Sequence, residues 1–471
     1  RLPGMTRHLL PGISRSSPPI NNPSPGGSSL LLSTEAPKDK IMKDQKKSSR
    51  PGTFRRWLLR RKVMERLAWG GVAFFTIVVL FYQVERWRGA RAWESAKEDY
   101  LATGGTLVMK DLLPAAIPAH DNFGALPIFK EIAVEESSLG EQNRQKLEQA
   151  HLQPPGKSST LGPRPNWFSD RENYFREYAA YLDLESEGLS SSEIAMKLLK
   201  FIDQKTGSVI QELEEGIARP KSQLCEHAFQ AAEERLWIHY AIPHLMPILD
   251  AARTVHLRGL TAIETNNPAA AFSSVVICLR LRGLIQNEFM VGLVVAKNID
   301  SWALDVVRYG IEKQIWSDDQ LASFTQERDR MLTRKSFRSV LQMEVVGLLQ
   351  TMNVMKNSVR DRVEVQTAMA AMGETNSGFL HMIIPKGWYD LNKVELLRSN
   401  LPLLSQGSSG ESLQELLSDI REREEKVEAL GESLWPSTFI VSQVTFAISP
   451  FGERVIIDDM KSGLMRGFCS I

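Results

Sequence analysis

Hydrophobic positions recur at helical spacing through most of the chain after residue 165. The clearest case lies between Ser190 and Ile217, where Glu193 stands three residues after Ser190 and completes a capping-box pattern. The apolar positions of this segment are Ile194, Leu198, Leu199, Ile202, Val209 and Leu213. Because these positions share one face of a helix, the pattern predicts an amphipathic helix here.

The same periodicity predicts further helices separated by short breaks. They are expected over residues 228–240, 242–264, 268–285, 289–315 and 317–331. Asn267 before Pro268 is a strong start signal, and Ser317 with Gln320 is another. Since short connections pair helices as antiparallel hairpins, we expect a mostly α fold. It would be a helical hairpin bundle or an irregular α-solenoid, tetratricopeptide-like at most locally.

One segment is apolar all round rather than on one face. Residues 67–84 carry no charge and lie between Arg66 and Glu85. As a helix they would cover about 27 Å, close to the roughly 30 Å of a bilayer core. Trp69 and Tyr82 stand near its ends, where interfacial aromatic residues are expected. The segment predicts a transmembrane helix with the lipid bilayer as its partner, and a buried core helix is the alternative.

Charge is distributed unevenly about this segment. Residues 1–66 contain 15 Lys and Arg against 4 Asp and Glu, whereas the other residues contain 42 against 52. Because Lys and Arg resist translocation, the N-terminus should be cytoplasmic and the C-terminal domain periplasmic, across the inner membrane. Residues 84–87 lack a small-residue cleavage pattern, so the anchor is expected to be uncleaved. The acidic body argues against nucleic acid as a partner.

Composition divides the chain into six regions. Residues 1–52 are rich in Ser, Pro, Gly and Lys and are expected to be a disordered basic cytoplasmic tail. The others are a basic juxtamembrane segment (53–66), the transmembrane helix (67–84), a juxtamembrane helix with a Pro-rich strap and linker (85–164), the α-helical domain (165–400), and a linker, charged amphipathic helix and C-terminal tail (401–471). Four prolines within 153–165 predict a hinge there, and residues 438–448 have some strand character.

Histidine and cysteine are the first candidates for chemistry. His227, His239, His244 and His256 fall within thirty residues of one another, and Cys225 precedes them. Their spacing matches neither a helical i, i+4 ligand pair nor a zinc finger, so no metal ligand is predicted. The three cysteines, Cys225, Cys278 and Cys469, are interpreted as isolated thiols with Cys278 buried, and a disulfide between residues 225 and 278 is the alternative.

Other catalytic patterns are missing from the sequence. It contains no Gly-x-Ser-x-Gly elbow, P-loop or dinucleotide fingerprint. The paired carboxylates Glu233-Glu234 and Asp318-Asp319 stand on a helix surface or at a helix start, where solvation and the helix dipole explain them. No catalytic or cofactor-binding residue is therefore predicted, and no cofactor.

The Asp121-Asn122-Phe123 turn is the most distinctive part of the strap. Asp and Asn side chains bond to their own backbone in turns. Phe123, with Ile128 and Phe129, is expected to pin the strap to the helical body. A ligand-binding role for the turn is the alternative.

Several segments carry a resemblance. Leu112–Pro118 followed by Asp121–Pro127 resembles the juxtamembrane signature of uncharacterised single-span proteins of planctomycete and verrucomicrobial bacteria. The Leu-Arg-Leu-Arg run at 279–282, and Pro385-Lys-Gly-Trp-Tyr389 followed by Asn392, are similar to the same family.

The match covers most of residues 60–400 and is loose in sequence. Gly124 stands where alanine is usual, and Lys461–Ile471 is unlike the family's continuation, as in a truncated or frame-shifted end. The family has no established activity. The resemblance therefore implies location and architecture and assigns no catalytic residue.

These observations favour a binding or scaffolding module in the cell envelope, with an envelope protein as partner. One alternative is an envelope hydrolase whose active site gathers His227, His239 or His244 with a carboxylate. A third reading makes residues 35–66 the functional part, tethering anionic lipid or nucleic acid.

Overall fold

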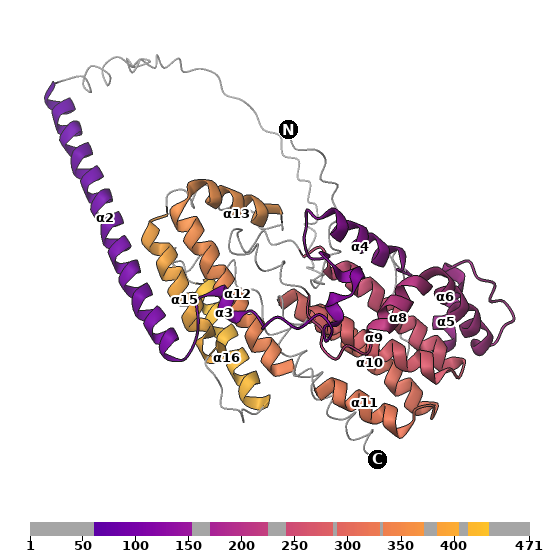
Figure 1. The fold of residues 1–471 in the computed structure, drawn as a ribbon. Helices are drawn as coiled ribbons and strands as arrows, with labels where there is room; N and C mark the ends of the chain where they lie inside the picture. Colours follow the sequence, from indigo (N-terminus) through magenta and orange to yellow (C-terminus); the bar gives the residue numbers. More distant parts are fainter. Residues whose placement is uncertain are drawn as a thin grey trace, which may run out of the picture. The chain divides into compact units, whose positions relative to one another are not determined.

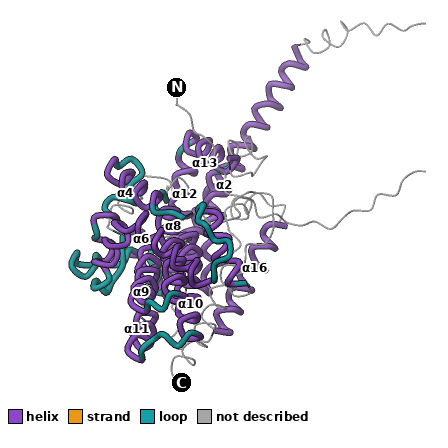
Figure 2. The backbone as a smooth tube through the Cα atoms, turned by 90° about the vertical axis from the view of Figure 1, so that its right-hand side faces the viewer, coloured by secondary structure: helices purple, strands orange, loops and turns teal. Residues whose placement is uncertain are grey.

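The described part of the chain is almost entirely helical. The computed structural model describes residues 61–152, 170–224, 242–285, 290–329, 333–371, 384–404 and 413–432. Within these ranges it contains helices and loops and no strand (Figures 1 and 2). The α-helices are α2 (Arg61–Ala102), α3 (Met109–Leu112), α4 (Ser138–Gln149), α5 (Arg171–Tyr181), α6 (Ser191–Gly216), α8 (Leu245–Glu264), α9 (Pro268–Ile285), α10 (Met290–Glu312), α11 (Asp318–Asp329), α12 (Thr333–Asn357), α13 (Val359–Ala371), α15 (Lys386–Leu404) and α16 (Leu413–Glu432). The mostly α fold predicted from periodicity is confirmed.

The chain divides into two compact units. Residues 1–78 with 158–161 form one, and residues 79–157 with 162–471 form the other. In the first unit the described part is the beginning of α2, where large apolar side chains such as Trp69 and Phe75 are exposed. All packing below belongs to the second unit, which contains two clusters of buried hydrophobic side chains.

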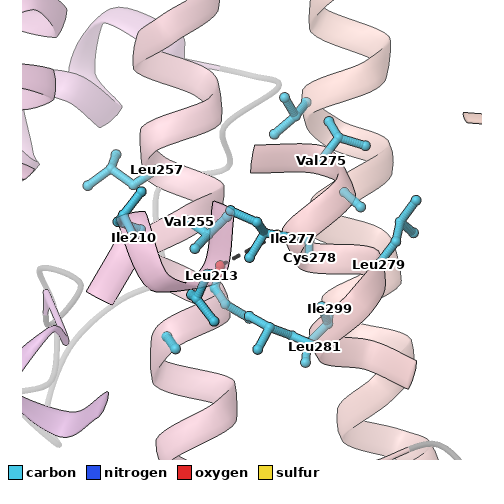
Figure 3. Close-up of a cluster of buried hydrophobic side chains, with 14 of the residues drawn as sticks. Ile210, Leu213, Val255, Leu257, Val275, Ile277, Cys278, Leu279, Leu281 and Ile299 are labelled. Atoms are coloured by element: carbon cyan, nitrogen blue, oxygen red, sulfur yellow. Dashed lines mark hydrogen bonds between the residues drawn. The ribbon is translucent and has the colours of Figure 1, made fainter. Parts of the chain in front are cut away.

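The first core is the cluster that runs from Phe123 to Phe324. Its centre is formed by α6, α8, α9 and α10, which pack against one another in sequence order. Figure 3 shows side chains of these helices meeting, among them Leu213, Val255, Ile277 and Ile299. Cys278 lies among them as a free, fully buried thiol, as the sequence predicts.

The predicted caps explain why these helices begin where they do. Ser190 and Glu193 form the predicted capping box at the start of α6. The side chain of Asn267 accepts a hydrogen bond from the amide of Ala270 at the start of α9. The preceding Asn266 has a φ of 54°, a left-handed conformation that asparagine tolerates, and it ends α8. Ser317 and Gln320 bond reciprocally at the start of α11, again as predicted.

Helix α9 is apolar all round because it is central, and its two arginines are buried with partners. Arg280 binds Glu327 on α11 through two contacts, and Arg282 lies 3.0 Å from Asp300 on α10. Residues two positions apart on a helix point in nearly opposite directions. The Leu-Arg-Leu-Arg run therefore reaches two different helices.

The second core joins the end of α2 to the C-terminal helices. It includes Tyr100 of α2, Met109 of α3, Phe337 of α12, Tyr389 of α15 and Ile420 of α16. Helices α12 and α15 pack closely, and α16 packs on α15. The predicted charged helix near residue 412 thus docks on its own domain at Ile420, which is 1 % exposed.

The segment between residues 85 and 164 contains more helix than the sequence predicted. Helix α4 was not predicted, because it has no apolar stripe and buries Asn143 and Arg144 beside Leu147. Arg144 donates to the carbonyl oxygens of Ile132 and Val134 and so holds the strap against α4. At the other end of the domain, α15 continues to Leu404, beyond the expected limit at residue 400.

Candidate functional site: the α2–α15 junction and its buried charges

The helix that carries the apolar segment crosses the first turn of α15. Trp388 donates a hydrogen bond from Nε1 to Oε2 of Glu85 at 2.9 Å, and its ring meets that of Phe81 edge-on with centroids 6.4 Å apart. Gly387 and Gly89 face each other at the crossing. A Cβ on Gly387 would overlap the carbonyl oxygen of Glu85, and a Cβ on Gly89 would overlap that of Gly387. Only glycines permit this backbone approach.

A cluster of charges lies behind this junction. Asp390 is fully buried and bonds Lys356 of α12 at 2.6 Å and Lys393 at 2.7 Å. Lys393 is 2 % exposed, donates to Oδ1 of Asn353 at 2.8 Å, and lies 4.1 Å from the ring centroid of Trp93. The cluster therefore connects α2, α12 and α15 through one carboxylate and two ammonium groups.

The pKa values of Lys393 and of the neighbouring Tyr389 are shifted from their ordinary values. Burial lowers the pKa of Lys393, while its hydrogen bond and attraction to Asp390 oppose that change. Burial raises the pKa of Tyr389, whose ring lies 5.0 Å from the guanidinium of Arg362. Through these contacts the enclosed Lys393 joins α15 to α2 and α12.

The end of α2 is held in the same way. The side chain of Gln342 donates to the hydroxyl of Tyr100 at 2.8 Å, and that hydroxyl bonds the carbonyl of Thr106. Burial raises the pKa of Tyr100. From Glu85 to Tyr100, α2 is therefore an integral part of the second core.

The histidines singled out in the sequence do not form one site. His227 and His239, with Cys225, lie outside the described residues. His244 is buried at the start of α8, and His256 lies twelve residues later on the same helix, roughly 18 Å along its axis. These two side chains are therefore too far apart to share a ligand.

His256 instead belongs to a cluster whose members come from different helices. Its Nε2 lies 3.9 Å from Asp305 of α10, and its ring stacks on Trp302 at 6.0 Å. Burial lowers the pKa of His256 to about 3, so the ring is neutral at physiological pH. A neutral imidazole beside a carboxylate can accept a proton only if the core opens.

A second histidine–aspartate pair was missed by sequence reasoning. His151 lies 3.4 Å from Asp250, which also bonds Arg253 at 2.7 Å. Arg253 in turn lies over Trp302. The members of this pair are about a hundred residues apart in the sequence, and no local pattern marks either of them. Within the described ranges, no three His, Cys, Asp or Glu side chains are grouped to hold a metal ion.

The carboxylate pairs behave as surface groups where they are described. Asp318 and Asp319 are exposed in the first turn of α11, where the helix dipole favours them. Glu233 and Glu234 lie outside the described residues, as does the segment 438–448.

The predicted strap turn is present, and its polar atoms are used internally. Asn122 is 3 % exposed, and its Oδ1 accepts from the amides of Gly124 and Gln223 while its Nδ2 donates to the carbonyl of Gln223. Lys221 completes a short parallel bridge with the backbone around Asn122. Gly124 is required because a Cβ there would overlap the carbonyl oxygen of Gln223. The turn closes the first core, with Phe123, Ile128 and Phe129 buried in it as expected.

Comparison with protein-family models, with curated proteins and with solved structures finds no match for this chain. The resemblance to single-span proteins of planctomycete and verrucomicrobial bacteria therefore stays a prediction.

Proposed function

We propose that this chain is a single-pass inner-membrane protein whose periplasmic helical body, a bundle of helical hairpins, serves as a binding or scaffolding module in the cell envelope. The lipid bilayer would hold residues 67–84, and an envelope protein would bind the body. The basic N-terminal residues would remain in the cytoplasm.

The observation that carries this proposal is the change of environment along α2. In the most apolar eighteen residues of this helix, no residue is buried. The side chains of Phe75 and Ile77, for example, are 69 % and 65 % exposed. A few turns later, Ala96 and Tyr100 are almost fully buried. An exposed apolar surface of this length is costly in water, and a bilayer removes that cost.

Helix α9 differs from α2 in that its apolar surface is buried. It also has the length and apolarity of a membrane span, but 72 % of it is buried in the first core. Its buried arginines have carboxylate partners on α10 and α11. Helix α9 is thus covered by protein, and α2 is the helix that needs a lipid environment.

The arrangement of helices in the body supports a binding role. Helix α9 follows α8 after a short connection and packs on it, and α12 packs on α15, so that helices lie side by side as they do in helical binding proteins. The α2–α15 junction would hold this body close to the membrane. These features support a scaffold and do not identify its partner.

The anchor is tested by placing charge within it. Phe75→Arg combined with Ile77→Arg should convert the protein from resistant to extractable when membranes are washed with carbonate, since each buried arginine costs about 2.5–3.5 kcal/mol on the insertion scale. Met196→Arg is the matched control, because Met196 is 60 % exposed on α6. Unchanged resistance in the double variant would refute the anchor.

Orientation is tested with protease added to intact spheroplasts. The helical body should be digested and the tail before residue 61 should survive. Survival of the body with loss of the tail would reverse the proposed topology.

The scaffold is tested by mild crosslinking of the tagged full-length protein in native membranes, followed by mass spectrometry. A reproducible envelope partner is expected. A protein recovered alone would favour the hydrolase alternative instead.

A further inference from the structure

Two valines on α13 form an exposed apolar pair close to the α2–α15 junction. Val359 and Val363 are 57 % and 48 % exposed and lie one helical turn apart. Outside α2, they are the only exposed large hydrophobic residues in the described ranges with this spacing. Val354, at the end of α12, is also exposed at 38 %. We call Val354, Val359 and Val363 the valine edge.

Two successive contacts connect the anchor to this edge. Phe81, within the apolar segment, meets Trp388 in the first turn of α15. The next residue, Tyr389, lies beneath the guanidinium of Arg362, which directly precedes Val363. Arg362 is itself buried and bonds the carbonyl oxygens of Met355 and Lys356, so it fixes the start of α13 to the end of α12.

Trp388 lies beside the end of the apolar segment of α2. Its ring touches Phe81 inside the apolar segment, and its Nε1 bonds Glu85, the first charge beyond that segment. An indole with one apolar side and one satisfied N–H is the arrangement found at membrane interfaces. If residues 67–84 span the bilayer, the body around Trp388 would lie where this helix leaves it.

We infer that the valine edge rests in the lipid interface, so that the body is bound to the membrane by a second, apolar contact beside its anchor. This inference rests on the proposed membrane anchor. The charges beside the two valines on α13 balance, since Arg360 and Arg362 alternate with Asp361 and Glu364. The occupant is thus the apolar boundary of the bilayer, and anionic headgroups are not required.

Spin labels on the full-length protein in vesicles test this contact. Cys225 and Cys469 are first replaced by serine, and Cys278 is retained because it is fully buried. Labels are then introduced by Val359→Cys or Val363→Cys, with Met196→Cys as the control on an exposed helix of the first core and Phe75→Cys as the control within the anchor. The vesicles are phosphatidylcholine, with and without phosphatidylglycerol.

The readout is the collision rate with oxygen, which enriches in lipid, relative to a water-soluble nickel chelate. Labels at positions 359 and 363 should show a several-fold higher ratio than the label at position 196, in both kinds of vesicle. Values equal to that at 196, with a high ratio at 75, would overturn this inference and leave the anchor intact. A low ratio at 75 as well would overturn the anchor and the inference together. A high ratio only in phosphatidylglycerol vesicles would also overturn the inference, because it would indicate electrostatic rather than apolar contact.

Discussion

The buried charged residues of the first core and those of the second core join different sets of helices. In the first core, Arg258, Arg280 and Arg282 each bond carboxylates on neighbouring helices of the same bundle. In the second core, Lys393, which is paired with Asp390, lies against Trp93 of α2, the helix that continues from the apolar segment. The ion pairs of the first core join helices of one bundle, whereas the second core also holds α2.

This difference shows which contacts couple α2 to the rest of the second unit. In the first core, each ion pair of Arg258, Arg280 and Arg282 joins helices of the same bundle. A charged cluster shared between α2, α12 and α15 makes the position of the anchor helix depend on the packing of the body. Disturbing the second core should therefore release α2, and disturbing the first core should not.

The largest effect is expected from Asp390→Ala. It leaves Lys356 and Lys393 without their shared carboxylate, and loss of one partner from a buried ion pair costs about 3–5 kcal/mol. Denaturant unfolding of the full chain in detergent would measure this loss. Hydrogen exchange should rise in α15 before it rises in α9.

Glu422→Ala is the matched control, since its ion pair with Lys426 is half exposed on both sides. It should change stability by less than about 1 kcal/mol. Equal losses for the two variants would contradict a special role for the buried cluster.

The next effect concerns pH and the first core. Because burial lowers the pKa of His256 to about 3, the unfolded chain takes up a proton near pH 6.5 that the folded chain resists. The stability contributed by the neutral ring is complete above pH 6.5 and falls as pH drops, by about 3 kcal/mol at pH 4.

His256→Gln should remove most of this slope in stability against pH. His120→Gln is the control, because the His120 side chain is 80 % exposed and should leave the slope unchanged. At pH 4, hydrogen exchange should increase in α8 before it increases in other helices. Earlier exchange in α15 would contradict the prediction that acid destabilises the first core through His256.

A smaller and more selective effect is expected from Gly387→Ala. The added Cβ would overlap the carbonyl oxygen of Glu85, so α2 must move away from α15 at a cost of about 1–3 kcal/mol. Trp388 fluorescence and exchange over residues 85–102 would report this movement. In contrast, Gly207→Ala on α6 has nothing within 4 Å of its new Cβ and should be neutral or stabilising by up to about 1 kcal/mol.

The smallest expected effect is local to the first core. Ser190→Ala removes the capping box of α6 and should cost about 1 kcal/mol. Thermal unfolding would measure it, and exchange should increase in the first turn of α6. Ser208→Ala, at an exposed position in the middle of the same helix, is the control and should not destabilise. Faster exchange at α2 in the Ser190 variant would contradict the separation of the cores.

Sequence reasoning succeeded where the signal was local. The starts of α6, α9 and α11 were predicted from Ser190, Asn267 and Ser317, because a cap needs only the residues that follow it. The turn at Asn122 was predicted for the same reason. Helix α4 was not predicted from the sequence, because a helix that buries Asn143 and Arg144 has no apolar periodicity to detect.

The candidate site could not be predicted from the sequence. Asp390 and Lys393 are one turn apart and look like an ordinary surface pair until Lys356 and Trp93 enclose them. The pairs His151 with Asp250 and His256 with Asp305 join separate helices. Their partners are set by tertiary packing, which leaves no trace in local spacing.

The sequence by itself determined the amphipathic helices of the first core such as α6, the caps of α6, α9 and α11, and the contrast between one uncharged segment and an acidic body. Those properties depend on residues within a few positions of one another. Only the tertiary structure decided that α9 is covered while the apolar half of α2 is exposed, although both segments have the length and apolarity of a membrane span. It also decided that Gly89 and Gly387 meet, and that one buried carboxylate serves two lysines. The physical reason is that burial and charge pairing depend on which helices become neighbours, and periodicity does not specify neighbours.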